Sequence, residues 1–188
     1  QVYTTSLTYD TSLWVPTKSV DGCGNITTYQ YDTSGNLTTL TQADGSVVTM
    51  GYSGRNRIRQ TDPLGNVTQY AYTSAGQLAS VTDARGLVTQ FAYDSFGNLT
   101  SQTASDGGVT SNTYDSLNRL TATKDPLGRI TTYTYDTSDQ QTSVTNPAGE
   151  VSTSVYSSGQ LIAVVDALGN RTSYTYNRFG SRATEQNA

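Results

Sequence analysis

Aspartate is the residue type in this sequence best suited to metal binding or catalysis, and it recurs at regular intervals along the chain. A ladder of aspartates could bind calcium, which takes about six to eight oxygen ligands. Turn formation explains the same residues without a metal, because Asp side chains bond to backbone groups of their own turn. Histidine is absent and Cys23 is the single cysteine, so the commonest general base, the commonest metal ligand and any intrachain disulfide are lacking. We therefore expect no metal site and no cofactor.

Serine and threonine are abundant, and either could act as a nucleophile if a base stood beside it. No serine has a histidine or a lysine at a recognisable spacing in the sequence. The carboxylates are spread singly along the chain rather than clustered. We therefore expect no catalytic residue and a protein that is not an enzyme.

Tyrosine is the second candidate, because the chain contains 14 tyrosines and exposed aromatic rings can stack on sugars. Aromatic residues at hairpin spacing are more often cross-strand pairs that stabilise a sheet. A carbohydrate-binding surface on the tyrosine rows stays open as the less favoured alternative. A nucleic-acid partner is not expected, since the net charge is −4 and the basic residues are scattered. No apolar run approaches the roughly 20 residues of a membrane span.

Eight of the tyrosines recur at intervals of 20 or 21 residues, and a glycine stands seven residues before each of them. Self-similarity at such a period indicates a tandem repeat, in which each unit buries its apolar face against its neighbours. The tyrosines are Tyr31, Tyr52, Tyr72, Tyr93, Tyr114, Tyr135, Tyr156 and Tyr176. The glycines are Gly24, Gly45, Gly65, Gly86, Gly107, Gly128, Gly149 and Gly169.

Each repeat contains two turn signals. The first is Asp-x-x-Gly, as in Asp62-Pro63-Leu64-Gly65, with the residue preferences of a type I turn. Asp44-Gly45 and Asp106-Gly107 are interpreted as shorter versions of it. The second turn follows the tyrosine and carries Gly, Asn or Asp, the residues that tolerate a left-handed backbone. Its expected left-handed positions are Gly35, Asn56, Gly76, Gly97, Asn118, Asp139, Gly159 and Gly180.

Between the two turns, residues alternate in the manner of β-strands, with the two aromatic positions on one face and a branched aliphatic residue on the other. Each period therefore predicts one β-hairpin. The expected fold class is all-β: tandem hairpin repeats of about 21 residues that form one continuous, coiled antiparallel sheet, as a spiral shell, tube or solenoid-like array. The composition, with 34% hydrophobic and 14% charged residues, indicates a thin core.

The turns also set the expected repeat boundaries. Residues 1–20 are expected to form either a degenerate partial repeat or an N-terminal cap, in which Trp14 and Pro16 break the pattern. The eight expected repeats are residues 21–43, 44–61, 62–82, 83–105, 106–124, 125–145, 146–165 and 166–188.

The most regular repeat runs from Gly86 through Tyr93-Asp94 to Gly97 and Leu99. It resembles the RHS or YD repeat, whose pattern is G-x-[IV]-T-x-x-x-Y-D-x-x-G-x-L. The resemblance extends over residues 21–182 in eight copies that keep the same register. It is therefore a far more specific signal than one isolated match would be.

The resemblance implies hairpins that wind into a spiral sheet around a hollow shell. Bacterial Rhs and Tc-type toxins use such a shell to encapsulate a toxic domain, and animal teneurins use it as an extracellular adhesion module. The toxin shells end in a self-cleaving D-P-x-G-L sequence. The nearest stretches here, at Asp62-Pro63 and Asp125-Pro126, have a different residue after the glycine and lie at ordinary turn positions. Self-cleavage is therefore not expected.

The favoured function is a non-enzymatic structural segment of a large secreted or cell-surface protein, which forms the wall of a β-sheet shell or tube around cargo such as a toxin domain. The alternatives are an extracellular adhesion or carbohydrate-binding module and the subunit of an extracellular β-sheet filament. The expected partners are neighbouring repeats of the same or identical chains, an enclosed cargo domain and glycans. The expected location is extracellular or at the cell surface.

Overall fold

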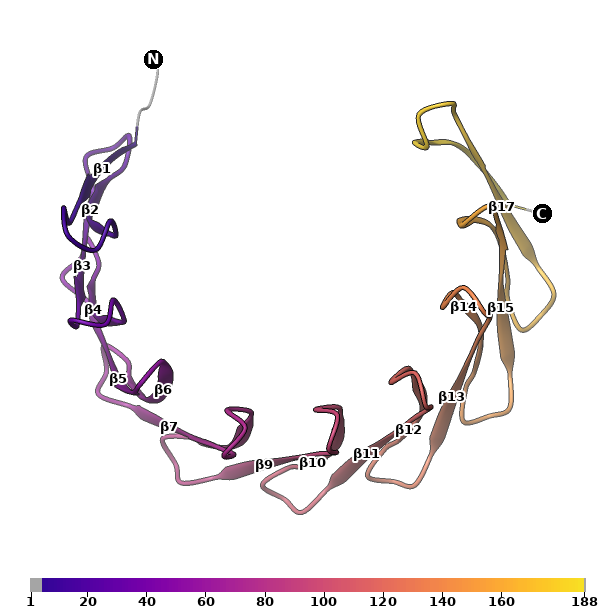
Figure 1. Cartoon of the computed structure of the whole chain (residues 1–188), viewed down its shortest axis with the longest axis horizontal. Coiled ribbons are helices and arrows are strands. Elements are labelled where there is room, and N and C mark those ends of the chain that lie inside the picture. The colour runs from indigo at the N-terminus through magenta and orange to yellow at the C-terminus, as the bar shows by residue number, and fades with distance from the viewer. Residues whose placement is uncertain (1–4, 188) are drawn as a thin grey trace. The chain divides into compact units, whose positions relative to one another are not determined.

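The computed structural model describes residues 5–187, and their only regular secondary structure is β-strand (Figure 1). The chain divides into two compact units, Gln1–Phe91 and Ala92–Ala188. The division falls inside one strand, β9 (Val88–Tyr93). Within residues 5–187, no helix is long and apolar enough to cross a membrane.

The first unit is an antiparallel meander in which each strand pairs with the next along the chain. Its strands are β1 (Ser6–Tyr9), β2 (Pro16–Val20), β3 (Ile26–Tyr31), β4 (Leu37–Thr41), β5 (Val47–Ser53), β6 (Asn56–Thr61), β7 (Val67–Tyr72), β8 (Leu78–Thr82) and β9.

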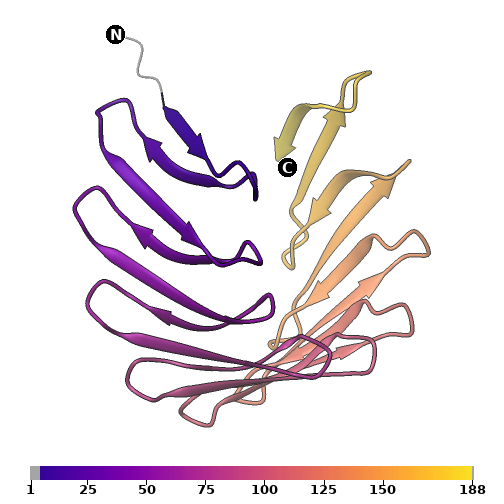
Figure 2. The same ribbon diagram turned by 60° about the vertical axis from the view of Figure 1, so that its left-hand side comes forward.

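The second unit follows the same plan, and Figure 2 shows its successive strands joined by tight turns at both ends. Its strands are β10 (Leu99–Thr103), β11 (Val109–Tyr114), β12 (Leu120–Lys124), β13 (Ile130–Tyr135), β14 (Gln141–Thr145), β15 (Val151–Ser157), β16 (Gln160–Val165), β17 (Arg171–Tyr176) and β18 (Arg182–Asn187). The all-β fold of tandem antiparallel hairpins that the sequence predicts is therefore confirmed.

Burial alternates along some strands, as the sequence pattern predicts, most regularly in β9 and β13, whereas β4, β8 and β14 are half-buried at every residue. In β7, Tyr70 and Tyr72 are half-buried on one face, whereas Gln69 and Ala71 are exposed on the other. Across residues 5–187, Ala163 is the single residue that is fully buried. The free energy of folding therefore comes from many half-buried side chains and from the hydrogen bonds of the sheet rather than from a deep core.

A β-bulge recurs just after the turn that follows seven of the repeat tyrosines. In the hairpin of β3 and β4, Gln30 lies opposite Thr39 and Tyr31 lies opposite Leu37, so Thr38 is an extra residue on its strand. The same shift occurs in the hairpins whose first strands contain Tyr52, Tyr72, Tyr114, Tyr135, Tyr156 and Tyr176. A bulge interrupts the regular ladder and increases the local twist.

Two sequence-based expectations about the turns are wrong. Asn56 does not occupy a left-handed position: it is the first residue of β6, and Gly54 has the positive φ (+59°) in a two-residue loop between Ser53 and Asn56. This loop is shorter because Gly54 can supply the left-handed conformation two residues after Tyr52.

The turns at Asp44 and Asp106 are not shorter than the others. The first runs from Gln42 to Ser46, with Gln42 N donating to Ser46 O at 2.8 Å, and the second runs from Ala104 to Gly108 in the same way. The aspartate has moved to the third position of the turn, where Asp44 Oδ1 still accepts the N–H of Ser46 at 2.9 Å. The turn length is thus unchanged because the left-handed glycine, rather than the aspartate, sets it.

The N-terminal segment contains one complete hairpin, β1 with β2. Its register also shifts, between Thr8 and Tyr9, at the place where the later hairpins carry their bulge. Residues 1–4 of the expected first segment and Ala188 of the expected eighth repeat lie outside the described residues. The repeat boundaries themselves stay a prediction.

Candidate functional site

The aspartates at the starts of the turns bond to their own turns. Asp62 is representative: its Oδ1 accepts the N–H groups of Leu64 (2.9 Å) and Asn66 (2.8 Å), and its Oδ2 accepts the Nδ2 of Asn66 at 2.8 Å. Gly65, with φ +84°, closes the turn by donating its N–H to Asp62 O. The same Asp–Asn side-chain bond recurs at Asp21, Asp32, Asp94 and Asp166.

These hydrogen bonds also favour the ionised form of the turn aspartates. The bond from Asn66 to the carboxylate is the largest influence that lowers the pKa of Asp62, and the equivalent asparagines act likewise on Asp21, Asp32, Asp94 and Asp166. Within residues 5–187, no group of three or more Asp, Glu, His or Cys residues is arranged to hold a metal ion. The carboxylates of these five turns instead accept hydrogen bonds from their own turns.

The glycines that the sequence singles out lie at left-handed positions. Gly24, Gly45, Gly65, Gly86, Gly107, Gly128, Gly149 and Gly169 all have φ between +81° and +87°. Gly35, Gly76, Gly97, Gly159 and Gly180 have φ between +78° and +92° in the turns that follow the tyrosines. Their proposed role in setting the repeat stays a prediction, which substitutions can test.

Each repeat tyrosine lies in the first strand of its hairpin, at its last residue or, for Tyr52 and Tyr156, at its second-last residue, and is half-buried. At least six of them donate the hydroxyl hydrogen to a backbone carbonyl 15 residues earlier, at 2.7–3.1 Å. They are Tyr31, Tyr72, Tyr114, Tyr135, Tyr156 and Tyr176. Tyr52 instead contacts the sulfur of Met50 at 3.8 Å. Burial, more than the neighbouring Tyr29, raises the pKa of Tyr31.

The carbonyls that accept these hydroxyls belong to the residues just before the bulges. Tyr135 bonds to Leu120, which precedes the extra residue Thr121, and Tyr156 bonds to Gln141, which precedes Thr142. Because a bulge interrupts the ladder, the carbonyl beside it needs another donor. The tyrosine of the next hairpin supplies it, so each of these tyrosines joins two successive hairpins. Sequence reasoning missed this role, although the constant 15-residue offset is visible in the repeat.

A second set of bonds joins successive turns on the tyrosine side of the hairpins. Asn36 Nδ2 donates to Gly54 O, and Asn98 Nδ2 donates to Asn118 Oδ1, both at 2.9 Å. Asn118 and Asp139 occupy left-handed positions (φ +63° and +62°), where glycine is the usual residue. The Asn118 side chain accepts the bond from Asn98, which a glycine at this position could not do.

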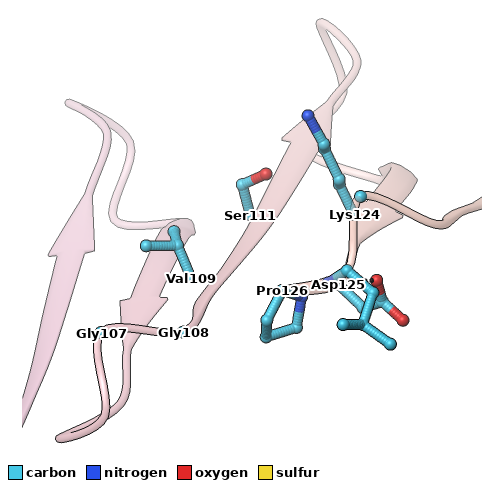
Figure 3. A pocket seen from close by; sticks show the side chains of 9 residues that line it. Gly107, Gly108, Val109, Ser111, Lys124, Asp125 and Pro126 are labelled. Carbon is cyan, nitrogen blue, oxygen red and sulfur yellow. Dashed lines mark hydrogen bonds between the residues drawn. The ribbon is translucent and has the colours of Figure 1, made fainter.

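The second unit has a groove of about 500 Å³ between the turns at 104–108 and 125–129 (Figure 3). Its lining includes Ser111, Lys124 and Pro126, and a Cβ at Gly108 would lie 3.3 Å from Pro126. Ser111 and Lys124 are partners across β11 and β12, a pairing that the sequence spacing did not reveal. No hydrogen bond joins their side chains among the described residues.

The tyrosine rows do not form an exposed aromatic platform. All eight repeat tyrosines are half-buried, and the strongly exposed aromatic residues lie in turns: Trp14, Phe96 and Phe179, at 80%, 78% and 76%. A carbohydrate site built on the repeat tyrosines would need open ring faces. The half-buried tyrosines therefore favour the structural role over the sugar-binding one.

Known proteins share this fold. Residues 2–184 match the family model described as Teneurin YD-shell. No curated protein sequence matches the chain. Among solved structures, TcdB2–TccC3 without its hypervariable C-terminal region superposes with a TM-score of 0.77 at 17% identity, covering 97% of this chain and 11% of that chain.

Two further solved structures share the fold. TcdB2–TccC3 superposes with a TM-score of 0.76 at 16% identity, covering 97% of this chain and 12% of that chain. The Tc holotoxin pore of Photorhabdus luminescens gives a TM-score of 0.63 at 19% identity, covering 98% of this chain and 13% of that chain. The chain thus spans 11–13% of the length of these three solved chains.

Proposed function

The chain belongs to the Teneurin YD-shell family, and on that premise we propose that it forms part of the wall of a β-sheet shell that encloses a cargo domain of a larger secreted or cell-surface protein. The observation that carries the proposal is the bond from each of six repeat tyrosines to the carbonyl before the preceding bulge. These bonds add to the strand ladder and join each hairpin to the one before it. The wall of a shell requires continuous bonding between successive hairpins and requires no reactive site.

The size of the chain relative to its structural neighbours supports a segment rather than a whole shell. It spans 11–13% of the three solved chains described above, and the first of these is TcdB2–TccC3 without its hypervariable C-terminal region. By analogy, the cargo of this protein is a domain carried on the same polypeptide or in the same assembly. The role of the present residues is structural, with no catalytic step.

Electron cryo-microscopy of the intact protein that contains this sequence tests the proposal. We expect these residues in the wall of a closed shell, with separate density inside it, and we expect the enclosed domain to resist added protease until the shell is unfolded. A wall without an enclosed volume, or a cargo domain digested at the same rate in the intact and the unfolded protein, would contradict encapsulation. Open filaments built from this segment would favour the fibre alternative instead.

A further inference from the structure

The turn between β1 and β2 differs from the other turns of the first unit in its length and in its left-handed residue. The turn at Asp32 closes on Asn36 with Gly35 at φ +81°, whereas the first turn runs one residue longer, from Asp10 to Val15. Trp14 donates its backbone N–H to Asp10 O at 3.1 Å and has φ +55°. A tryptophan thus stands where the comparable turn has glycine.

A tryptophan at this left-handed position is expected to lower the stability of the fold. A bulky residue with positive φ is strained. Burial does not compensate for the strain, because Trp14 is 80% exposed, and its indole N–H has no hydrogen-bond partner among residues 5–187. Strained residues of this kind cluster at binding sites, where the surrounding structure holds a side chain in the orientation that a ligand needs. The first hairpin therefore presents the indole ring to solvent at the cost of stability.

We propose that Trp14 is the stacking platform of a saccharide-binding site, with Asp10 and Thr11 as its hydrogen-bonding groups. A pyranose with equatorial hydroxyls has a flat face of C–H groups that fits an open indole ring, and its hydroxyls need polar partners beside that ring. Asp10 Oδ1 accepts the N–H groups of Ser12 and Leu13, both at 2.8 Å, and the hydroxyl of Ser12 at 2.6 Å. Asp10 Oδ2 and the Thr11 hydroxyl have no partner among the described residues, so both are available to a ligand.

The charges of the hairpin favour a sugar over a lipid surface. An exposed tryptophan also suits a membrane interface, but such sites draw their affinity for anionic lipids from clustered Lys and Arg. Lys18 is the single cation between Ser6 and Val20, and the Asp10 carboxylate lies in the same turn as the indole ring. The Asp10 carboxylate would repel an anionic lipid headgroup, whereas it does not repel a neutral, polyhydroxylated ligand.

The other aromatic residues that are exposed in turns do not share these features. Phe96 and Phe179 stand at the third position of five-residue turns, and neither has a positive φ. Phe179 is also covered on one face by Arg178, whose Cζ lies 4.5 Å from the ring centroid. Phe179 is therefore a suitable matched control for Trp14.

Fluorescence provides a direct test because Trp14 is the only tryptophan of the chain. The full chain is titrated with cellotriose and chitotriose, which carry equatorial hydroxyls or acetamido groups, with mannitol as an acyclic control and with phosphatidylserine vesicles. We expect a saturable change in the emission with at least one trisaccharide and none with mannitol. A shift with vesicles and with neither trisaccharide, or no shift with any probe, would overturn the proposal.

Substitutions distinguish a ligand site from a merely exposed residue. Trp14→Gly removes both the ring and the strain, so we expect saccharide affinity measured by calorimetry to fall at least tenfold while the urea midpoint of unfolding rises. Thr11→Val should weaken binding severalfold at an unchanged midpoint, and Phe179→Ala should bind like the parent. Unchanged binding by Trp14→Gly, or a lower urea midpoint for it, would count against the site.

Discussion

The guanidinium group of Arg119 links two successive turns of the second unit through Asp139. Its Nη1 lies 2.9 Å from Asp139 Oδ1 and 2.9 Å from Asp136 O, while its Nε donates to Asp115 Oδ2 at 2.8 Å in its own turn. The side chain is only 22% exposed, and its Cζ lies 4.9 Å from the ring centroid of Tyr135. Asp139 itself has φ +62°, so its side chain is an acceptor at a position usually given to glycine.

Removing Arg119 is therefore expected to destabilise the second unit more than removing an ordinary surface arginine. Arg119→Ala should lower the urea midpoint clearly, whereas Asp139→Gly should have a smaller effect, because glycine relieves the left-handed strain as the ion pair is lost. Arg129→Ala is the control, since Arg129 is 62% exposed and pairs with Asp125 of its own turn. A double-mutant cycle that finds no coupling between Arg119 and Asp139 would refute the link.

The tyrosine hydroxyls should stabilise the array by bonding to the carbonyls before the bulges. Tyr135→Phe removes the 2.9 Å bond to Leu120 O and leaves the ring in place. We expect a loss of about 1 kcal/mol in the free energy of unfolding, the usual contribution of one such bond. Tyr133→Phe in the same strand is the control, because the Tyr133 hydroxyl makes no hydrogen bond within the described chain. Equal effects of the two substitutions in urea unfolding would show that the hydroxyl bond is not the stabilising feature.

The left-handed glycines should tolerate substitution poorly. Gly97 has φ +92°, and Gly97→Val would place a β-branched side chain there. The expected loss is on the order of 1–3 kcal/mol. Phe96→Val in the same turn is the matched control, because Phe96 is 78% exposed and does not have a positive φ. A Gly97→Val protein that melts at the same temperature as the parent would show that this turn does not require glycine.

The turn aspartates should make the array sensitive to acid. The pKa values of Asp62, Asp94 and Asp166 are lowered from the ordinary 3.8, chiefly by the asparagine that donates to each carboxylate. A lowered folded-state pKa adds stability that is complete above the ordinary value and is lost as the pH falls through the folded-state value. The melting temperature should therefore hold steady from neutral pH down to about pH 5 and fall below about pH 4.

The chain itself suggests the control for this pH dependence. Asn146 builds the same turn without a titrating group: its Oδ1 accepts the N–H groups of Ala148 (2.9 Å) and Glu150 (3.0 Å). The combined replacement of Asp62, Asp94 and Asp166 by Asn should flatten the fall in melting temperature below about pH 4. An equally steep fall in this variant would assign the acid sensitivity to other groups.

The hairpins could be predicted from the sequence because their determinants are local. The residues that set a turn such as Asp62–Asn66 lie within five positions of one another, and the alternation of a strand such as β7 is read along the same stretch. The wrong predictions are local as well. The spacing of four residues after Tyr52 assigns the left-handed role to Asn56, but Gly54 takes that role two residues earlier. The choice between two possible turn residues depends on the strand register, which the bulge shifts.

The sequence by itself determined the period, most of the turns and the all-β fold, since each follows from residue types at short spacing. Only the tertiary structure decided what each repeat residue bonds to in the neighbouring hairpin. Tyr135 reaches Leu120 and Arg119 reaches Asp139 because β12 pairs with β13 and so sets the two hairpins side by side, at sequence separations of 15 and 20 residues. Tyr52 has the same place in its repeat as Tyr135 and contacts Met50 instead. A repeat pattern specifies equivalent positions, but the acceptor at each position depends on the side chains that pack around it in space.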